Sequence, residues 1–299
     1  MSEVRFDDRV AVITGAGGGL GKTYALMLAA RGAKVVVNDL GGSADGTGAS
    51  KAADAVVEEI KAAGGEAAAN YDSVATPEGG EAIIKTALET FGKVDIVVNN
   101  AGILRDRSFA KLAPEDLSVV LDVHLKGAFF VSQPAFRAMK EQKYGRFVFT
   151  ASAAGIFGNF GQSNYGAAKM GLVGLSNVIA VEGMKAGIKS NVIAPIARTR
   201  LTENLLGPLA EALDPEQVTP LVAYLCSEAC DLSHEVFSVG GGRFARIFTG
   251  LAEGWSAGKG SRPTPEDVRE NMEQIMNLDG HIIPKSIADE MGILMKAMR

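Results

Sequence analysis

A tyrosine and a lysine stand four residues apart in the stretch SNYGAAK, residues 163–169. Because residues i and i+4 share one face of a helix, Tyr165 and Lys169 are predicted to project together. A free tyrosine has a pKa of about 10, too high for a base at neutral pH, and a nearby lysine cation lowers it by favouring the phenolate. Only glycine and alanine separate the two residues, so no carboxylate cancels that effect. The pair therefore predicts a tyrosine that takes a proton from a substrate alcohol.

A serine ends the apolar run RFVFTAS, residues 146–152, thirteen residues before the tyrosine. The Ser152 hydroxyl is placed to hydrogen-bond the substrate oxygen while Tyr165 exchanges the proton. The alternative is an exposed tyrosine and lysine on an ordinary amphipathic helix. Ser152 and a glycine-rich loop near the N-terminus favour the catalytic interpretation.

The glycine-rich loop lies in VITGAGGGLGKT, residues 12–23, between a predicted strand and a predicted helix. Glycines let the backbone turn tightly and approach a pyrophosphate, whose charge meets the first N–H groups of the helix. The residues predicted to bind the cofactor here are Gly15, Gly19, Leu20 and Gly21.

An acid follows the second predicted strand, KVVVN at 34–38. The Asp39 carboxylate can accept hydrogen bonds from the ribose hydroxyls of a dinucleotide and would repel a 2′-phosphate. No arginine follows it directly or stands in the glycine-rich loop. The expected cofactor is therefore NAD rather than NADP.

The same loop also fits a loose nucleotide-triphosphate motif, AGGGLGKT at residues 16–23. In that alternative Lys22 reaches the phosphates and Thr23 binds magnesium. The first position is alanine rather than glycine, and no apolar strand ends in a clear magnesium-binding aspartate. A P-loop NTPase is thus the alternative from another functional class.

Short β-rich runs alternate with alanine-rich helical stretches along most of the chain. Several runs are continuously apolar, as in strands that are buried on both faces of a parallel sheet. The expected fold is α/β, a Rossmann-type doubly wound parallel sheet of about seven strands. Residues 1–241 form the dinucleotide-binding catalytic domain, and residues 242–299 form a C-terminal extension packed on it. The predicted strands are 9–14, 34–38, 66–71, 94–99, 146–152, 189–194 and 235–239.

Charge and composition narrow the choice of partner. The formal net charge is −5, so the overall field does not favour nucleic acid or an anionic membrane. Cys226 and Cys230 are interpreted as buried thiols, and no metal site is expected, because the three histidines are scattered. No signal peptide or stretch of membrane-spanning length is evident, and a cytoplasmic location is expected.

Four motifs together resemble the short-chain dehydrogenase/reductase family over about residues 8–240: TGAGGGLG, NNAG at 99–102, Ser152 and YGAAK. The resemblance implies a Rossmann-type domain, a nicotinamide cofactor, and hydride transfer by Ser152, Tyr165 and Lys169. His124 stands where the family usually has a fourth catalytic residue, an asparagine. Further cofactor-binding residues implied by the resemblance are Asp72, Ser73, Val74, Asn99, Ala101, Gly102, Tyr165, Lys169 and Pro195.

Within that family the sequence is similar to the (3R)-hydroxyacyl-CoA dehydrogenase part of peroxisomal multifunctional enzymes of type two. Stretches such as NNAGILRDRSF and NVIAPIARTRLTE carry this similarity. It implies NAD-dependent oxidation of a 3-hydroxyacyl-CoA, with a fatty or steroid side-chain acyl group, by a homodimer or homotetramer. The alternative within the family is a 3-ketoacyl-acyl-carrier-protein reductase or another carbonyl reductase.

Two further pairs of residues each allow two alternative roles. Phe157 and Phe160 either line a hydrophobic substrate cleft or pack in the core. Arg105 and Arg107 either meet CoA phosphates or are solvated charges.

Overall fold

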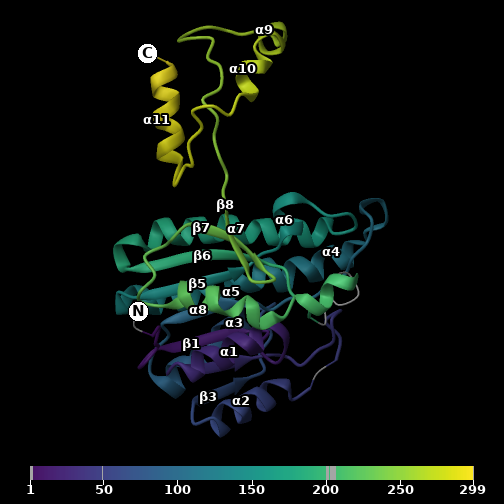
Figure 1. The fold of residues 1–299 in the computed structure, drawn as a ribbon, viewed down its shortest axis with the longest axis vertical. Coiled ribbons are helices and arrows are strands. Elements are labelled where there is room, and N and C mark those ends of the chain that lie inside the picture. The colour runs from purple at the N-terminus through teal and green to yellow at the C-terminus, as the bar shows by residue number, and fades with distance from the viewer. Residues whose placement is uncertain (1–2, 49, 200–201, 203–206, 299) are drawn as a thin grey trace. The chain divides into compact units, whose positions relative to one another are not determined.

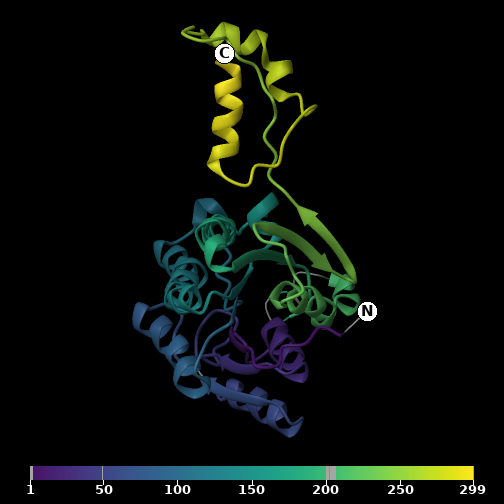
Figure 2. The same cartoon turned by 90° about the vertical axis from the view of Figure 1, so that its left-hand side faces the viewer.

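The structure is a computed structural model that describes residues 3–48, 50–199, 202 and 207–298. It consists of two compact units, which divide between Arg246 and Ile247. The first unit carries an α/β sheet, and the second unit is helical (Figures 1 and 2).

The sheet of the first unit has eight strands in the order β3-β2-β1-β4-β5-β6-β7-β8. All pairs from β3 through β7 are parallel, and Val12 of β1 lies between Val36 of β2 and Val97 of β4. This order reverses direction at β1 and β4, where doubly wound sheets bind ligands at their carboxyl edge. The strands are β1 (Val10–Thr14), β2 (Lys34–Asn38), β3 (Glu66–Asn70), β4 (Ile96–Asn99), β5 (Gly145–Thr150), β6 (Ile188–Pro195), β7 (Glu235–Gly240) and β8 (Arg243–Ile247). The predicted fold class is thus confirmed, with one strand more than expected.

The additional strand, β8, begins inside the segment that the sequence assigned to an extension. Only Gly241 and Gly242 join it to β7, with φ angles of 57° and 74°. A two-residue connection joins antiparallel strands, and a type I′ turn needs positive φ at both positions. The glycine pair therefore lets the chain turn back and pair once more with the sheet.

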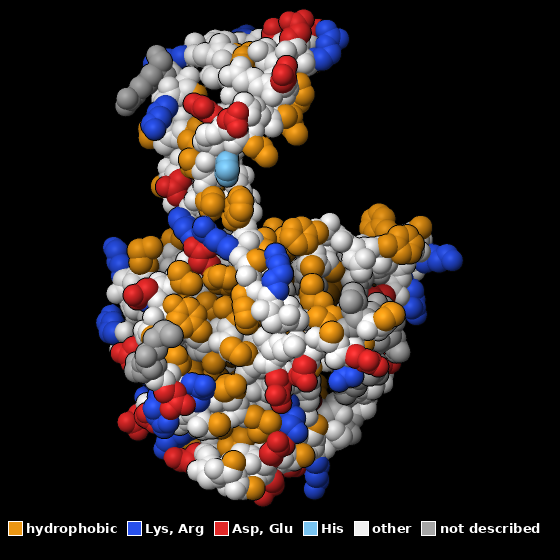
Figure 3. Space-filling view, in the orientation of Figure 1, with side chains coloured by type: hydrophobic (Ala, Val, Ile, Leu, Met, Phe, Trp, Pro, Cys, Tyr) orange, Lys and Arg blue, Asp and Glu red, His pale blue; other side chains and the backbone are white. Residues whose placement is uncertain are grey.

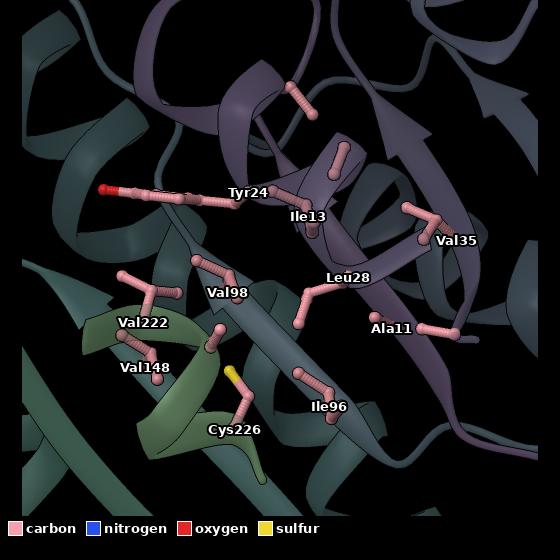
Figure 4. Packing of buried hydrophobic residues seen from close by; sticks show 14 of the residues in the cluster. Ala11, Ile13, Tyr24, Leu28, Val35, Ile96, Val98, Val148, Val222 and Cys226 are labelled. Atoms are coloured by element: carbon pink, nitrogen blue, oxygen red, sulfur yellow. The ribbon is translucent and has the colours of Figure 1, made fainter. Parts of the chain in front are cut away.

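Helices cover both faces of the sheet, and alternate residues of each strand face one side or the other. Ala11 and Ile13 of β1 pack in a core with α1, α2 and α8, while Val10 and Val12 pack in a second core with α3, α5 and α7. Figure 4 shows the first core, where Tyr24 and Cys226 lie among strand side chains. The helices of this unit are α1 (Gly19–Ala30), α2 (Ala52–Ala62), α3 (Pro77–Phe91), α4 (Pro114–Leu121), α5 (Gly127–Gln142), α6 (Ala153–Phe157), α7 (Ser163–Gly183) and α8 (Thr219–Cys226), with short helical turns η1 (Phe109–Lys111), η2 (Asp122–Lys126), η3 (Met184–Ala186), η4 (Gly207–Ala212) and η5 (Pro215–Gln217).

Both cysteines, Cys226 and Cys230, are free and buried, as expected. Burial raises the pKa of both thiols, which keeps them in the unreactive protonated form. They contribute to packing at the end of α8 rather than to a reactive site.

The second unit contains α9 (Pro265–Glu270), α10 (Met272–Met276) and α11 (Ile287–Ala297). Thr264 and Asp267 form a capping box that starts α9. Leu251 and Ile282 exchange two backbone hydrogen bonds, which close the loop between them. Across both units, none of the described helices is long and apolar enough to span a bilayer.

Candidate active site

The carboxyl edge of β5 and the first turns of α7 bring the three predicted catalytic residues together. Ser152 follows β5 and caps α6, where its Oγ accepts a hydrogen bond from the Ala154 N–H at 3.2 Å. Tyr165 and Lys169 lie one helical turn apart on α7. The Lys169 Nζ is 5.5 Å from the centre of the Tyr165 ring. Tyr165 and Lys169 therefore share one face of α7, as predicted.

Lys169 is deeply buried, with 3% of its surface exposed. Its Nζ donates a 2.5 Å hydrogen bond to the Thr150 carbonyl at the end of β5. Burial disfavours the charged form and lowers the pKa of Lys169 to about 7. The lysine can thus gain or lose a proton near neutral pH.

Tyr165 departs from the expectation that its lysine neighbour lowers its pKa. Burial of the phenol raises the pKa of Tyr165 to about 12, a hydrogen bond from Ser152 opposes this, and the charge of Asp106 adds to it. The Lys169 ammonium is directed to the Thr150 carbonyl. Burial therefore dominates the pKa of Tyr165, and the phenol is protonated at neutral pH.

His124 lies on the π-helical turn η2 between α4 and α5, and it is buried. Its Nε2 is 3.0 Å from the backbone nitrogen and 2.8 Å from the backbone oxygen of Ile103. Burial, and then the charge of Lys169, lower the pKa of His124 well below its usual value, so the ring is neutral. Among the described residues, no group bonds its Nδ1. Single π-helical turns within helices are frequent at functional sites.

The glycine-rich loop is clamped against the loop that follows β4. Gly15 has φ of 63°, and a Cβ there would lie 2.8 Å from the Cα of Ala101. The Asn100 side chain donates to the carbonyls of Thr14 and Gly15, at 3.0 and 3.1 Å. The Thr14 hydroxyl accepts from the backbone nitrogens of Asn100 and Ala101. Both loops that are predicted to touch the cofactor are therefore held as one surface.

The start of α1 is open around two of its glycines. A Cβ added at Gly18 would meet nothing within 4 Å, and one at Gly19, where φ is 51°, would meet only the Thr199 side chain. Open space at the start of a helix is what a phosphate site requires, because the first N–H groups of a helix have no partner within it. Leu20 and Gly21 follow within the same turn.

Asp39 lies directly after β2, as predicted, and its carboxylate organises the backbone around it. The two carboxylate oxygens accept from the Gly17 N–H at 2.8 Å and the Gly41 N–H at 2.6 Å. Each oxygen keeps a further lone pair for a ribose hydroxyl. The negative charge therefore lies beside the glycine-rich loop.

The remaining predicted cofactor residues lie at the carboxyl ends of β3, β4 and β6. Asp72 is exposed and accepts a 2.7 Å hydrogen bond from the Asn70 side chain, and Ser73 and Val74 follow it in the loop before α3. Asn99 differs from the others, because its side chain donates to Ser132 in the interior. Gly102 lies against the His124 ring, and Pro195 is the last residue of β6.

Sequence reasoning missed Asn100 and Thr14, which join the two cofactor loops, and the amide pair Asn38 and Asn70, whose side chains bond each other at 2.8 Å. All four are polar residues at or just after the end of a buried apolar strand. That position was the available signal, since parallel strands end at one edge of the sheet.

The residues of the P-loop alternative are engaged elsewhere. The Lys22 Nζ lies 2.7 Å from a carboxylate oxygen of Glu59 on α2. The Thr23 hydroxyl donates to the Leu20 carbonyl and accepts from Thr219, each at 2.8 Å. Both side chains therefore have partners within the protein. In the part of the chain that the structure describes, no cluster of acids, histidines or cysteines forms a metal site.

The aromatic and basic residues considered for substrate contact differ in exposure and in hydrogen bonding. Phe157 and Phe160 are 72% and 90% exposed, so the interpretation as core residues is wrong. Arg105 donates to the Asp45 carbonyl at 2.9 Å, whereas the Arg107 side chain is 60% exposed. Apolar and charged side chains of both signs alternate over the face of the first unit that Figure 3 shows.

Comparisons with known proteins agree with this geometry. The family described as short chain dehydrogenase matches residues 9–206. The chain is 50% identical over 300 residues to peroxisomal multifunctional enzyme type 2 of Mus musculus, covering 99% of this chain and 40% of that protein. The full-length structure of the Drosophila melanogaster enzyme of the same name matches with a TM-score of 0.82 and 40% identity, covering 99% of this chain and 50% of that one.

A third comparison concerns a cofactor complex. The structure of 7α-hydroxysteroid dehydrogenase with NADH and 7-oxo glycochenodeoxycholic acid matches with a TM-score of 0.72 and 29% identity, covering 80% of this chain and 95% of that one. The present chain thus spans about half or less of the two multifunctional relatives, and nearly all of this shorter dehydrogenase. Because the family matches residues 9–206 and the mouse relative aligns with 99% of the chain, the chain is an enzyme of the short-chain dehydrogenase family.

Proposed function

We propose that this enzyme oxidises a (3R)-3-hydroxyacyl-CoA to the 3-ketoacyl-CoA with NAD. The observation that carries the proposal is the meeting of Ser152, Tyr165 and Lys169 at the sheet edge beside the clamped glycine-rich loop. The similarity to dehydrogenase parts of multifunctional enzymes supports the hydroxyacyl substrate. The acyl group is a fatty chain or a steroid side chain.

In this mechanism Tyr165 removes the hydroxyl proton of the substrate. Ser152 holds the substrate oxygen and hydrogen-bonds the phenol, which lowers the pKa of Tyr165 against the effect of burial. NAD would supply the hydride acceptor when it is bound. Lys169 would hold the nicotinamide ribose, and because its pKa is about 7 it can pass on the proton that Tyr165 takes.

The cofactor choice depends on Asp39. Its carboxylate lies 2.8 Å from the Gly17 nitrogen, within the loop proposed to hold the pyrophosphate. A 2′-phosphate at that place would meet a fixed negative charge. The related dehydrogenase that is complexed with NADH supports a nicotinamide cofactor.

The substrate approaches over exposed aromatic side chains in this proposal. Phe157 and Phe160 lie on α6 and on the loop before α7, and Phe109 on η1 is 82% exposed. These three side chains offer apolar surface to an acyl chain, and Arg107 offers a cation to CoA phosphates. We further expect a homodimer or homotetramer, to which the second unit contributes, and light scattering after gel filtration measures this. The cytoplasmic location stays a prediction, since the matched relatives are named peroxisomal.

The test is a steady-state assay with a panel of 3-hydroxyacyl-CoA thioesters of both configurations, with NAD and NADP. We expect turnover of the 3R thioesters with NAD. Turnover confined to reduction of 3-ketoacyl-carrier-protein substrates with NADPH would favour the reductase alternative and contradict this proposal.

A further inference from the structure

The side chain directly before Tyr165 is an amide that lies in the protein interior. Asn164 is the second residue of α7, and only 1% of its surface is exposed. A side-chain amide has two N–H donors and an acceptor oxygen, and in the interior an unpaired donor or acceptor costs free energy. The partners of these atoms therefore show which parts of the protein Asn164 holds together.

The amide oxygen bonds the main chain of Tyr165. The Asn164 Oδ1 accepts a hydrogen bond from the Tyr165 N–H at 2.8 Å. Tyr165 lies in the first turn of α7, where backbone N–H groups have no partner within the helix. The next N–H group, that of Gly166, already bonds the Gln162 carbonyl at 2.6 Å. The main chain at Tyr165 is thus held by the Asn164 side chain.

The amide nitrogen joins two segments that are distant in the sequence. The Asn164 Nδ2 donates to the Arg105 carbonyl and to the Asp116 carbonyl, each at 3.0 Å. These two residues are 59 and 48 positions away along the chain. Because a carbonyl only accepts, both partners require the nitrogen at this place, and the orientation of the amide is fixed. Both donors and the oxygen of Asn164 are therefore in use.

The two joined segments carry other parts of the site. The segment that leads to Arg105 includes Ile103, whose backbone bonds the His124 ring. Helix α4, which contains Asp116, continues directly into η2, which carries His124. His124 packs against the Tyr165 ring. The same two segments thus hold the ring of Tyr165 through His124 and its main chain through Asn164.

We propose that Asn164 is a positioning residue that sets the place of the Tyr165 hydroxyl by fixing the start of α7 to α4 and to the loop after β4. The inference rests on the proposed function in taking Tyr165 as the group that exchanges the proton. Proton transfer needs a distance of about 2.6–3.2 Å between heavy atoms, and a displacement of about 1 Å can lower a rate about 10²-fold. Asn164 therefore controls the rate through Tyr165, without contact with the substrate.

The decisive variant is Asn164→Ala in the full chain, which removes all three hydrogen bonds. The place of the Tyr165 ring is followed by NMR of carbon-13-labelled tyrosine, and its signal is identified by its loss in Tyr165→Phe. The His124 ring beside it shifts this signal, so a displaced Tyr165 ring changes it. We expect the signal to move or broaden in Asn164→Ala. Asn177→Ala, at a partly exposed asparagine of the same helix, is the matched control and should leave it unchanged.

The consequence for the reaction is measured in a single turnover of a (3R)-3-hydroxyacyl-CoA with saturating NAD. Formation of NADH then reports the chemical step apart from product release, and titration with NADH counts the binding sites. We expect the rate constant per binding site to fall about 10- to 100-fold in Asn164→Ala, and the Kd for NADH to change less than about twofold. A merely structural role would instead lower the number of binding sites and leave the rate constant of the remaining sites unchanged.

An unchanged Tyr165 signal in Asn164→Ala would overturn the inference, and so would a displaced signal together with the wild-type rate constant. If Asn164→Ala does not fold, the same measurements are made on Asn164→Ser, whose short side chain cannot reach both carbonyls. The NMR measurement needs no substrate, so an absence of turnover in the wild type would count against the proposed function alone.

Discussion

The rings of His124 and Tyr165 meet edge to face, with centroids 5.2 Å apart and planes at 88°. The same imidazole binds the backbone of Ile103, next to Gly102 in the loop predicted to hold the cofactor. One buried side chain therefore joins the catalytic helix to the cofactor loop. The π-helical turn η2 is what places it there.

Replacement of His124 by alanine should weaken both connections. The ring contact contributes about 1 kcal/mol and the bond to Ile103 about 1 kcal/mol more. We expect His124→Ala to lower kcat about tenfold and to weaken NAD binding severalfold, with partial rescue in His124→Asn, which can still bond Ile103. Steady-state kinetics and fluorescence titration with NADH measure the two effects. His281→Ala, in the second unit, is the matched control, and a wild-type kcat in His124→Ala would show that the side chain has no role.

Tyr165→Phe removes the hydroxyl that exchanges the proton while keeping the ring against His124. Because general acid–base catalysis contributes about 10²- to 10⁴-fold, we expect kcat to fall by about 10³-fold and NAD affinity to change less than about twofold. Tyr71→Phe, at an exposed tyrosine, controls for loss of a hydroxyl elsewhere. Retention of the wild-type rate would show that another group takes the proton.

Asp39 can be tested with two variants that separate its charge from its hydrogen bonds. Asp39→Asn keeps an acceptor for one backbone N–H but removes the negative charge, whereas Asp39→Ala removes both. We expect NADP affinity to rise about tenfold in Asp39→Asn, which corresponds to about 1.4 kcal/mol of relieved repulsion. We expect Asp39→Ala to lose NAD affinity as well. The measurement is the ratio of dissociation constants for NAD and NADP, and an unchanged ratio in both variants would exclude Asp39 from cofactor selection.

Lys169 should make folding stability depend on pH in a predictable direction. Its pKa is about 7 in the folded protein and about 10.4 in an unfolded chain, so between these values the unfolded state holds one proton more. The free energy of unfolding should therefore rise with pH from about 7 to about 10, by up to about 1.4 kcal/mol per pH unit from this residue. Tyr165, whose pKa is raised to about 12, acts in the opposite direction only above about pH 10.

Lys169→Met isolates that contribution. Urea unfolding of both proteins at several pH values gives the difference in slope. Lys185→Met, at a lysine within η3, is the matched control and should keep the slope of the wild type. Equal slopes in the wild type and Lys169→Met would mean that the buried lysine stays charged throughout this range.

Much of the fold was predictable because strands buried on both faces need continuous apolar residues. The run KVVVN coincides with β2, and EVFSV differs from β7 by one residue. Helical periodicity likewise placed Tyr165 and Lys169 on one face of α7. These features depend on neighbours a few residues apart, which the sequence displays directly. The edge strand β8 was missed because two of its five residues are arginines and it follows a glycine pair that also suits a loop.

Tertiary structure alone decided the contacts and the electrostatics of the site. Asn100 and Thr14 are 86 residues apart, and only the adjacent positions of β1 and β4 bring them together. The sequence predicted an acidic Tyr165 from its lysine neighbour, but burial raises its pKa instead. Spacing shows which charges are near along the chain, whereas desolvation depends on every segment that packs around a group. His124, which packs against Tyr165, comes from such a segment.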